Sequence, residues 1–324
     1  MKKISSLFFL AFVCQACVSE FLLPNSVPFK KMPVLNCILN PDSTIKIALS
    51  FNKPANADPR HFEPIPNATI TLYENDLLLA AQIPFDTVTQ HYTLNYQPKA
   101  NHKYHIKASN IAGFSDLEAT DIVPPTLNDF AITFLPSVPN SPQGQLNIGC
   151  TMKNQFQNNP NARYWFAFLI HDFAFNTFPL RGCDTNKVII KRTYAETQST
   201  LADGFLTKSI DTDRMTSGEL IRLNDLATPK DSISILFNIN PNFCGMFSSN
   251  INNLHPKQDF FIDVLSTSLH FDKYLKTSLL EVAEKRDMFY SPNPFSQSIL
   301  VYSNIANGLG IFAAVSTKRK SIKP

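Results

Sequence analysis

Few residues of the sequence combine the type and spacing that chemistry requires. His171 and Asp172 follow an apolar run, where an imidazole and a carboxylate could act as a base and its partner. Neighbours on a strand point to opposite faces, so an ordinary polar pair at a strand end is the favoured interpretation. The sequence also lacks the motifs GxSxG, HExxH, GxGxxG and GxxxxGK(S/T). We therefore predict a non-enzymatic protein with no catalytic residue and no cofactor.

One acidic segment resembles part of a calcium-binding loop. Residues 211–213 supply two aspartates and Glu219 follows, but Met215 and Thr216 stand where such a loop needs an oxygen ligand and a glycine. The seven histidines are scattered along the chain. These patterns predict no metal site.

The first residues have the pattern of a secretion signal, predicted to span residues 1–16. Lys2 and Lys3 precede an apolar stretch, residues 4–13, which is too short to span a bilayer. Ala16 then stands immediately before Cys17, and a small residue before a cysteine is what lipoprotein signal peptidase requires. We predict cleavage after Ala16 and lipidation of Cys17, where each buried methylene of the acyl chains contributes about 0.8 kcal/mol to membrane binding. The alternative is an ordinary secreted protein cleaved near Ala16.

Four cysteines remain after the predicted cleavage: Cys37, Cys150, Cys183 and Cys244. An exported protein meets an oxidising compartment, so one or two disulfides could form, but the sequence does not choose among the three pairings. Buried free thiols are an equal alternative. No CxxC spacing occurs, which argues against a zinc site.

Composition indicates a folded chain that does not bind nucleic acid. Of 324 residues, 44% are hydrophobic and 17% charged, and the net charge is only +3. Part of this charge lies in the leader and in the last eight residues, 317–324, which we expect to form a basic disordered tail.

The first half of the chain predicts an antiparallel β-sandwich over residues 34–125, after a lipidated tether over residues 17–33. Apolar and polar residues alternate over residues 45–51, and similar short strands are expected over 68–73, 92–96 and 104–108. The polar residues 74–76 predict a turn. Pro124 and Pro125 mark the expected domain boundary.

Residues 126–316 predict a larger β-rich domain with one amphipathic helix. The apolar run 164–170 suits a strand buried on both faces, and further strands are expected over 233–239, 260–265 and 299–302. Residues 268–286 have a helical stripe of apolar residues, with Ser268 as N-cap.

Several blocks point to a known family. They lie at 34–36, 39–42, 66–74, 104–124 and 271–275, and the most specific block comprises Asn293, Pro294, Phe295, Ser303, Asn304, Gly308, Gly310 and Phe312. In this order and spacing, the chain resembles the Bacteroidetes lipoprotein family known as domain of unknown function 4249. The chain departs from the family at Ala313 and at residues 101–102, where family members commonly have glycine.

The resemblance implies an outer-membrane lipoprotein with an N-terminal immunoglobulin-like domain, commonly encoded beside TonB-dependent receptors. It carries over no catalytic residue. Three segments also match the Asp-(Ser/Thr)-aliphatic pattern of O-glycosylation in this bacterial group, so Ser43, Thr87 and Ser232 are candidate glycosylation sites. Ordinary turn and strand-start residues are the alternative interpretation.

The closing block also has a structural interpretation without the family. Ser303 and Asn304 end an expected strand, and Gly308 and Gly310 permit backbone angles that a side chain would forbid. A final strand then begins near Phe312. We predict a turn that locks the last hairpin into the core, with a ligand-binding loop as the alternative.

From the sequence we expect a non-enzymatic lipoprotein that assists a TonB-dependent β-barrel transporter. The rival hypotheses are a structural or adhesive envelope protein and an extracellular enzyme acting on glycans or peptides. The anchor places the protein on the outer membrane. Glu20 after Cys17 favours the cell surface, with the periplasmic face as the alternative.

Overall fold

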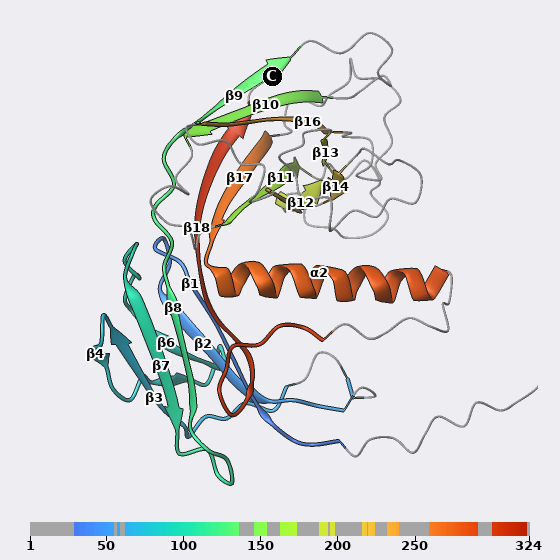
Figure 1. Ribbon diagram of the computed structural model, residues 1–324. Helices are drawn as coiled ribbons and strands as arrows, with labels where there is room; N and C mark the ends of the chain where they lie inside the picture. Colours follow the sequence, from blue (N-terminus) through green and yellow to red (C-terminus); the bar gives the residue numbers. More distant parts are fainter. Residues whose placement is uncertain are drawn as a thin grey trace, which may run out of the picture.

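The computed structural model shows a mainly β protein, as predicted (Figure 1). It describes residues 29–54, 57–58, 62–135, 146–153, 163–173, 188–193, 195–197, 216–218, 220–223, 232–239, 259–290 and 300–322. The described strands form sheets of nine, five and four strands.

The N-terminal strands form a β-sandwich. One layer has the order β1-β2-β6-β5 at one end of the nine-stranded sheet, and the other has the order β4-β3-β7-β8. The bounds are β1 Pro33–Leu39, β2 Ile45–Phe51, β3 Thr69–Glu74, β4 Leu77–Ala80, β5 Phe85–Asp86, β6 His91–Leu94, β7 Lys103–Ser109 and β8 Leu117–Ile122. This strand order is consistent with an immunoglobulin-like sandwich.

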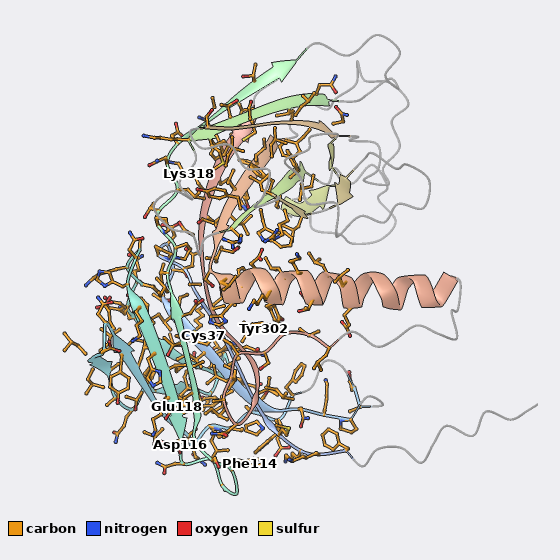
Figure 2. The ribbon with its side chains drawn as sticks, in the orientation of Figure 1. Cys37, Phe114, Asp116, Glu118, Tyr302 and Lys318 are labelled. Atoms are coloured by element: carbon orange, nitrogen blue, oxygen red, sulfur yellow. The ribbon has the colours of Figure 1, made fainter. Side chains whose placement is uncertain are left out.

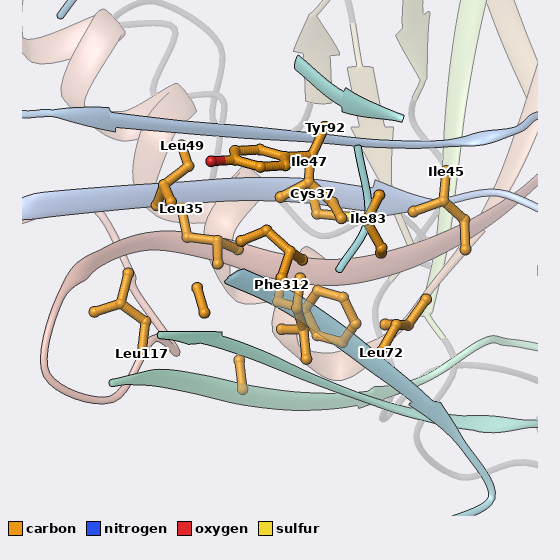
Figure 3. Packing of buried hydrophobic residues seen from close by; sticks show 14 of the residues in the cluster. Leu35, Cys37, Ile45, Ile47, Leu49, Leu72, Ile83, Tyr92, Leu117 and Phe312 are labelled. Atoms are coloured by element: carbon orange, nitrogen blue, oxygen red, sulfur yellow. The ribbon is translucent and has the colours of Figure 1, made fainter. Parts of the chain in front are cut away.

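Alternating apolar residues of both layers make the sandwich core. Ile45, Ile47 and Leu49 of β2 are almost fully buried, as the period of two predicts. Figure 3 shows them in one cluster with Leu72 and Leu117 of the opposing layer. Burying each such side chain contributes about 1.5–3 kcal/mol, so this core is the main source of the sandwich's stability.

The predicted polar turn after β3 is confirmed. Asn75 and Asp76 have φ of 49° and 66°, and β3 and β4 pair on either side of them. Positive φ at both central residues is what a two-residue hairpin turn requires, and Asn and Asp tolerate it.

The remaining strands enclose a second core. A five-stranded sheet has the order β14-β13-β16-β10-β9, and β12, β11 and β17 extend the nine-stranded sheet, with β15 beside β11. Ile148 and Ile235 of the former pack in one cluster with Phe166 and Ile262 of the latter. The bounds are β9 Phe130–Leu135, β10 Leu146–Lys153, β11 Arg163–Phe173, β12 Val188–Thr193, β13 Ala195–Thr197, β14 Thr216–Gly218, β15 Leu220–Arg222, β16 Ser232–Ile239 and β17 Asp259–Thr267. The strands expected over 164–170, 233–239 and 260–265 are therefore present, and residues 164–169 of β11 are all buried.

The last strand joins the sandwich to the C-terminal sheets. β18 (Leu309–Ile322) pairs in parallel with β1 through Ala314 and antiparallel with β17 from Val315 onward. Figure 1 shows it as one long red ribbon running between the two parts of the molecule. The sandwich therefore contains residues from both ends of the described chain.

The prediction of a disordered tail over residues 317–324 is wrong for the described part. Residues 317–322 lie in β18 and pair with β17. The prediction failed because the positively charged side chains have partners within the fold. Arg319 makes two hydrogen bonds to Asp263, and Lys320 donates to the carbonyl of Phe130. The boundary expected at 316 also falls inside this strand.

The helix α2 (Leu269–Tyr290) matches the prediction for residues 268–286 and continues one turn further. The Oγ of Ser268 accepts a hydrogen bond from the backbone N–H of Phe271 at 3.2 Å, so Ser268 is the N-cap. Residues 300–302, which belong to the strand expected over 299–302, lie outside the strands that the structure describes. The prediction of a closing hairpin is therefore wrong, because the neighbours of β18 are β1 and β17.

The close approach of β18 to β1 depends on glycine. Gly310 has φ of +109°, and a Cβ there would lie 2.1 Å from the carbonyl oxygen of Leu35 on β1. The backbone of a neighbouring strand cannot move aside as a side-chain tip can, so both conformation and space exclude a side chain at residue 310.

We predict that Gly310→Ala lowers the free energy of unfolding by more than about 3 kcal/mol, because it adds a backbone clash to the roughly 1–2 kcal/mol cost of positive φ. Gly113→Ala is the matched control: Gly113 has φ of +80°, but no atom lies within 4 Å of the added Cβ. Urea unfolding of both variants separates the free-energy cost of the positive φ from the cost of the steric clash. Equal losses for the two variants would contradict the argument.

Candidate functional site

A buried ion pair holds the first turn of α2 against the C-terminal sheets. Arg222 Nε and Nη2 donate to the two carboxylate oxygens of Asp272 at 2.6 and 2.9 Å, and Trp165 Nε1 donates to the same carboxylate at 2.9 Å. The side chains of Arg222 and Asp272 are only 6% and 4% exposed. Arg222 Nη1 also donates to the carbonyl of Leu223. The pair is thus buried and bidentate, which makes its partners costly to separate.

The contacts of this ion pair indicate a positioning role. Apolar side chains of α2, Leu275 and Leu279, pack near Trp165 and Ala167 on β11. Asp272 fixes the rotation of the helix that places these leucines on the sheet. The group is therefore best described as an anchor for α2.

Ser268 forms a second polar junction at the start of α2. Its backbone N–H donates to the carbonyl of Ala314 at 2.9 Å, and its Oγ accepts from the N–H of Ala314 at 3.3 Å. The Ser268 hydroxyl also lies close enough to the carboxyl of Asp121 on β8 to oppose the rise of that group's pKa. Ser268 therefore connects the sandwich, the helix and β18.

Asp121 is buried within this junction. It is 6% exposed, and among the described residues its Oδ2 has no hydrogen-bond partner. Burial raises the pKa of Asp121 from 3.8 to about 7, although hydrogen bonds from Ser268 and from the backbone of Ile122 and Ala314 oppose the shift.

Tyr302 and His270 lie beside the junction. The rings stack with centroids 5.9 Å apart, and the Tyr302 hydroxyl is 2.7 Å from His270 Nδ1. The N–H of Tyr302 donates to Thr277 Oγ1, which ties this segment to the helix. Figure 2 shows Tyr302 next to the beginning of α2. Burial and nearby Lys273 both lower the pKa of His270.

The closing block, predicted as structural, closes the free edge of β18. Asn304 Oδ1 accepts from the N–H of Phe312 at 2.9 Å, and Asn304 Nδ2 donates to its carbonyl at 2.7 Å. A primary amide thus takes the place of a neighbouring strand. Ser303 Oγ accepts from the N–H of Ile305, and Asn307 donates to the carbonyl of Asp116.

Gly308 and Ala306 bring the same loop against the opposing layer of the sandwich. Ala306 donates its N–H to the carbonyl of Glu118 on β8 at 2.9 Å, and a Cβ at Gly308 would lie 2.7 Å from Leu117 Cδ2. Gly308 is therefore required for space, whereas the sequence predicted a requirement for backbone angle. Asn293, Pro294 and Phe295 lie outside the described residues.

Glu74 and its hydrogen-bond partners form a polar cluster at one corner of the sandwich, which the sequence did not predict. Glu74 accepts hydrogen bonds from the hydroxyls of Tyr96 (2.7 Å) and Tyr104 (2.5 Å) and lies 3.1 Å from His102 Nδ1. The Tyr104 hydroxyl also accepts from the backbone N–H of Lys99 at 2.8 Å, which resembles the tyrosine corner of immunoglobulin-like domains. Burial alone would raise the pKa of Glu74, but the hydrogen bonds from Tyr104, Tyr96 and His102 hold it below its usual value.

Ser43, Thr87 and Ser232, the candidate glycosylation sites, are all exposed. Asp86 accepts from the N–H of Val88 and the hydroxyl of Thr89, so residues 86–89 form a tight turn with Thr87 at its surface. Exposure is necessary for modification, and glycosylation of these residues stays a prediction.

The two cysteines that the structure describes are buried. Cys37 and Cys150 are buried free thiols in two different cores, and burial raises the pKa of each to about 12. Such thiols are poor nucleophiles.

His171 and Asp172 occupy successive positions of β11, paired with β12. Outside the described residues lie Ala16, Cys17, Glu20, Cys183, Cys244, Met215, Glu219 and residues 211–213.

No three His, Cys, Asp or Glu side chains in the described part of the chain come together as a metal site. Within the same residues, no helix has the length and apolar character needed to cross a bilayer.

The family model described as domain of unknown function (DUF4249) matches residues 20–321. No curated protein matches the chain. The match includes both the sandwich and the C-terminal sheets.

Comparison with an exposed ion pair gives a direct test of the anchor. Arg222→Met leaves Asp272 buried without its cation and should lower the free energy of unfolding by about 3–5 kcal/mol. Lys103→Met is the control: the side chains of Lys103 and its partner Asp76 are 44% and 73% exposed, so the loss of this pair should cost about 1 kcal/mol or less. Urea unfolding followed by fluorescence of Trp165, the single tryptophan, measures both. Similar losses would contradict an anchoring role for Arg222.

The amide that closes the edge of β18 can be tested separately. Asn304→Ala removes the hydrogen-bond partners of the N–H and the carbonyl of Phe312, and it should lower the free energy of unfolding by about 1–3 kcal/mol. Asn307→Gly removes one exposed hydrogen bond while retaining the positive φ of 62°, and should cost under about 1 kcal/mol. Thermal unfolding of the two variants would contradict the assignment if Asn307→Gly were the more damaging change.

Proposed function

The chain belongs to the DUF4249 family, and from this premise we propose that it is a non-enzymatic, lipid-anchored outer-membrane protein that assists a TonB-dependent transporter. In this proposal the acyl chains on Cys17 hold the protein on the membrane. The C-terminal sheets contact the barrel or its cargo, by capturing a ligand or by capping the barrel.

The direction of β1 relative to β18 is the observation that carries the proposal. β1 is the first described strand after the predicted anchor, and its beginning pairs with the beginning of β18, Val34 with Leu309. The two strands are parallel, so the anchored end of the sandwich is opposite the end where β18 enters the C-terminal sheets. The sandwich would then stand between the membrane and those sheets.

The length of β18 sets the scale of this arrangement. At about 3.3 Å per residue, its 14 residues span about 45 Å. The part of the tether between Cys17 and β1, residues 18–32, could add at most about 50 Å when fully extended. A protein on the outer membrane could therefore present its C-terminal sheets above a neighbouring barrel.

The polar clusters described above favour a binding or structural role for the protein over catalysis by the residues of these clusters. Arg222, Asp272 and Glu74 bind partners within the protein, where each positions an element of the fold. The same elongated sandwich also suits the rival proposal, a structural or adhesive envelope protein in which it acts as a spacer.

We predict that Cys17→Ser releases the protein from the outer membrane, because no acyl chain can then be attached. The measurement is the share of protein in the outer-membrane fraction of the cells. Cys14→Leu, three residues earlier, is the control: it removes the neighbouring thiol, keeps an apolar side chain and should leave the protein anchored. Retention of Cys17→Ser in the outer-membrane fraction would contradict the anchor.

The transporter partnership needs its own measurement. Crosslinking the native protein in outer membranes, followed by affinity purification and mass spectrometry, should recover one TonB-dependent barrel in near-equal amount. Recovery of the protein alone would contradict the accessory role and favour the spacer or adhesin.

A further inference from the structure

Asp121 occupies the point where the sandwich and the C-terminal sheets join. On β18, Ala314 is the last residue paired with β1, and Val315 is the first paired with β17. The N–H of Ala314 donates to Ser268 Oγ, and the Asp121 carboxyl lies close enough to both residues for them to oppose the rise of its pKa that burial causes. Asp121 comes from β8, in the opposing layer of the sandwich, so its carboxyl links that layer to the junction.

The surroundings make the charge of Asp121 costly at this point. One carboxylate oxygen has no hydrogen-bond partner among the described residues, and the side chain is 94% buried. Among the residues that the structure describes, the titratable groups that face Asp121 are Tyr104, opposite it on β7, and Tyr302, whose pKa burial and the charge of Asp121 both raise. His270 and Lys273 of α2 lie against Tyr302. Tyr104 donates its hydrogen bond to Glu74, and Lys273 lies 5.4 Å from the centre of the Tyr302 ring.

We propose that Asp121 is a proton-operated latch between the sandwich and the start of α2. With its carboxyl neutral, the buried oxygen carries no charge and the junction stays closed. With the carboxyl ionised, opening the junction to water becomes favourable, which frees Ser268 and Ala314 and lets the C-terminal sheets move against the sandwich. The proposal rests on the junction alone and does not depend on the lipid anchor or a transporter.

The direction of the pH dependence follows from the sign of the shift. Burial raises the pKa of Asp121 above its ordinary value of 3.8, to about 7. The closed state therefore holds a proton that the open state releases. This contribution to closure is complete below about pH 4 and is lost as the pH rises through about 7. Protonation of His270, whose pKa is lowered, would favour opening at low pH and so has the opposite sign.

Hydrogen–deuterium exchange of the purified full-length protein at pH 5 and pH 8 tests the latch. After correction for intrinsic exchange rates, protection at the start of α2 and around Ala314 should fall at least about tenfold at pH 8, since one pKa unit corresponds to a tenfold change. Protection in β2 should stay constant. Asp121→Asn should remove the pH dependence, whereas Asp116→Asn, at an exposed carboxylate paired with Lys107, should retain it.

Equal protection at the two pH values in the unaltered protein would overturn the proposal, as would a pH dependence that persists in Asp121→Asn. If Asp121→Asn does not fold, Ser268→Ala provides the second measurement. It removes a hydroxyl that stabilises the ionised carboxylate, so the midpoint of the pH profile should move to higher pH. A midpoint that stays in place would overturn the latch.

Discussion

The structure depends on how the backbone groups of β18 are paired, because this strand changes neighbours partway along its length. β1 occupies one edge of its first half, and β17 occupies the other edge of its second half. The remaining edge of the first half would be unpaired and partly buried, which costs free energy for each orphaned group. Ser268, the residue directly after β17, bonds Ala314, and Asn304 bonds Phe312 in the same way. Side chains thus continue the sheet where no strand is present.

The polar residues at the start of α2 serve this continuation. The helix begins where β17 ends, so its first turn must lie against the sheet, and Asp272 holds it there through Arg222 and Trp165. Buried ion pairs contribute little net stability but exclude other arrangements, because a displaced partner leaves an uncompensated charge. The ion pair therefore favours one position of α2 on the sheet, and the apolar contacts of Leu275 and Leu279 stabilise that position.

Local patterns predicted the strands and the helix, because the period of apolar residues depends only on which face is buried. Residues 45–51 and the Ser268 cap are examples. The path of β18 was not predictable in this way, since Lys318 and Lys320 resemble a frayed end until Asp129 and Phe130 are placed beside them. The charge of Arg222 within the apolar residues 220–223 was a usable sign of a buried pair, but its partner lies fifty residues away. The contacts of Glu74 are likewise long-range.

The position of Asp121 follows from the same constraint. β18 leaves β1 at Ala314 and pairs with β17 from Val315 onward, so Ala314 is the point where the sheet passes from the sandwich to the C-terminal part. A group that changes the stability of the contacts at this point changes how firmly the sandwich is held against the C-terminal sheets, without disturbing either core. Asp121 lies beside this point on β8, outside the nine-stranded sheet, and it belongs to neither apolar cluster, so the proposed latch acts at the junction and not within a core.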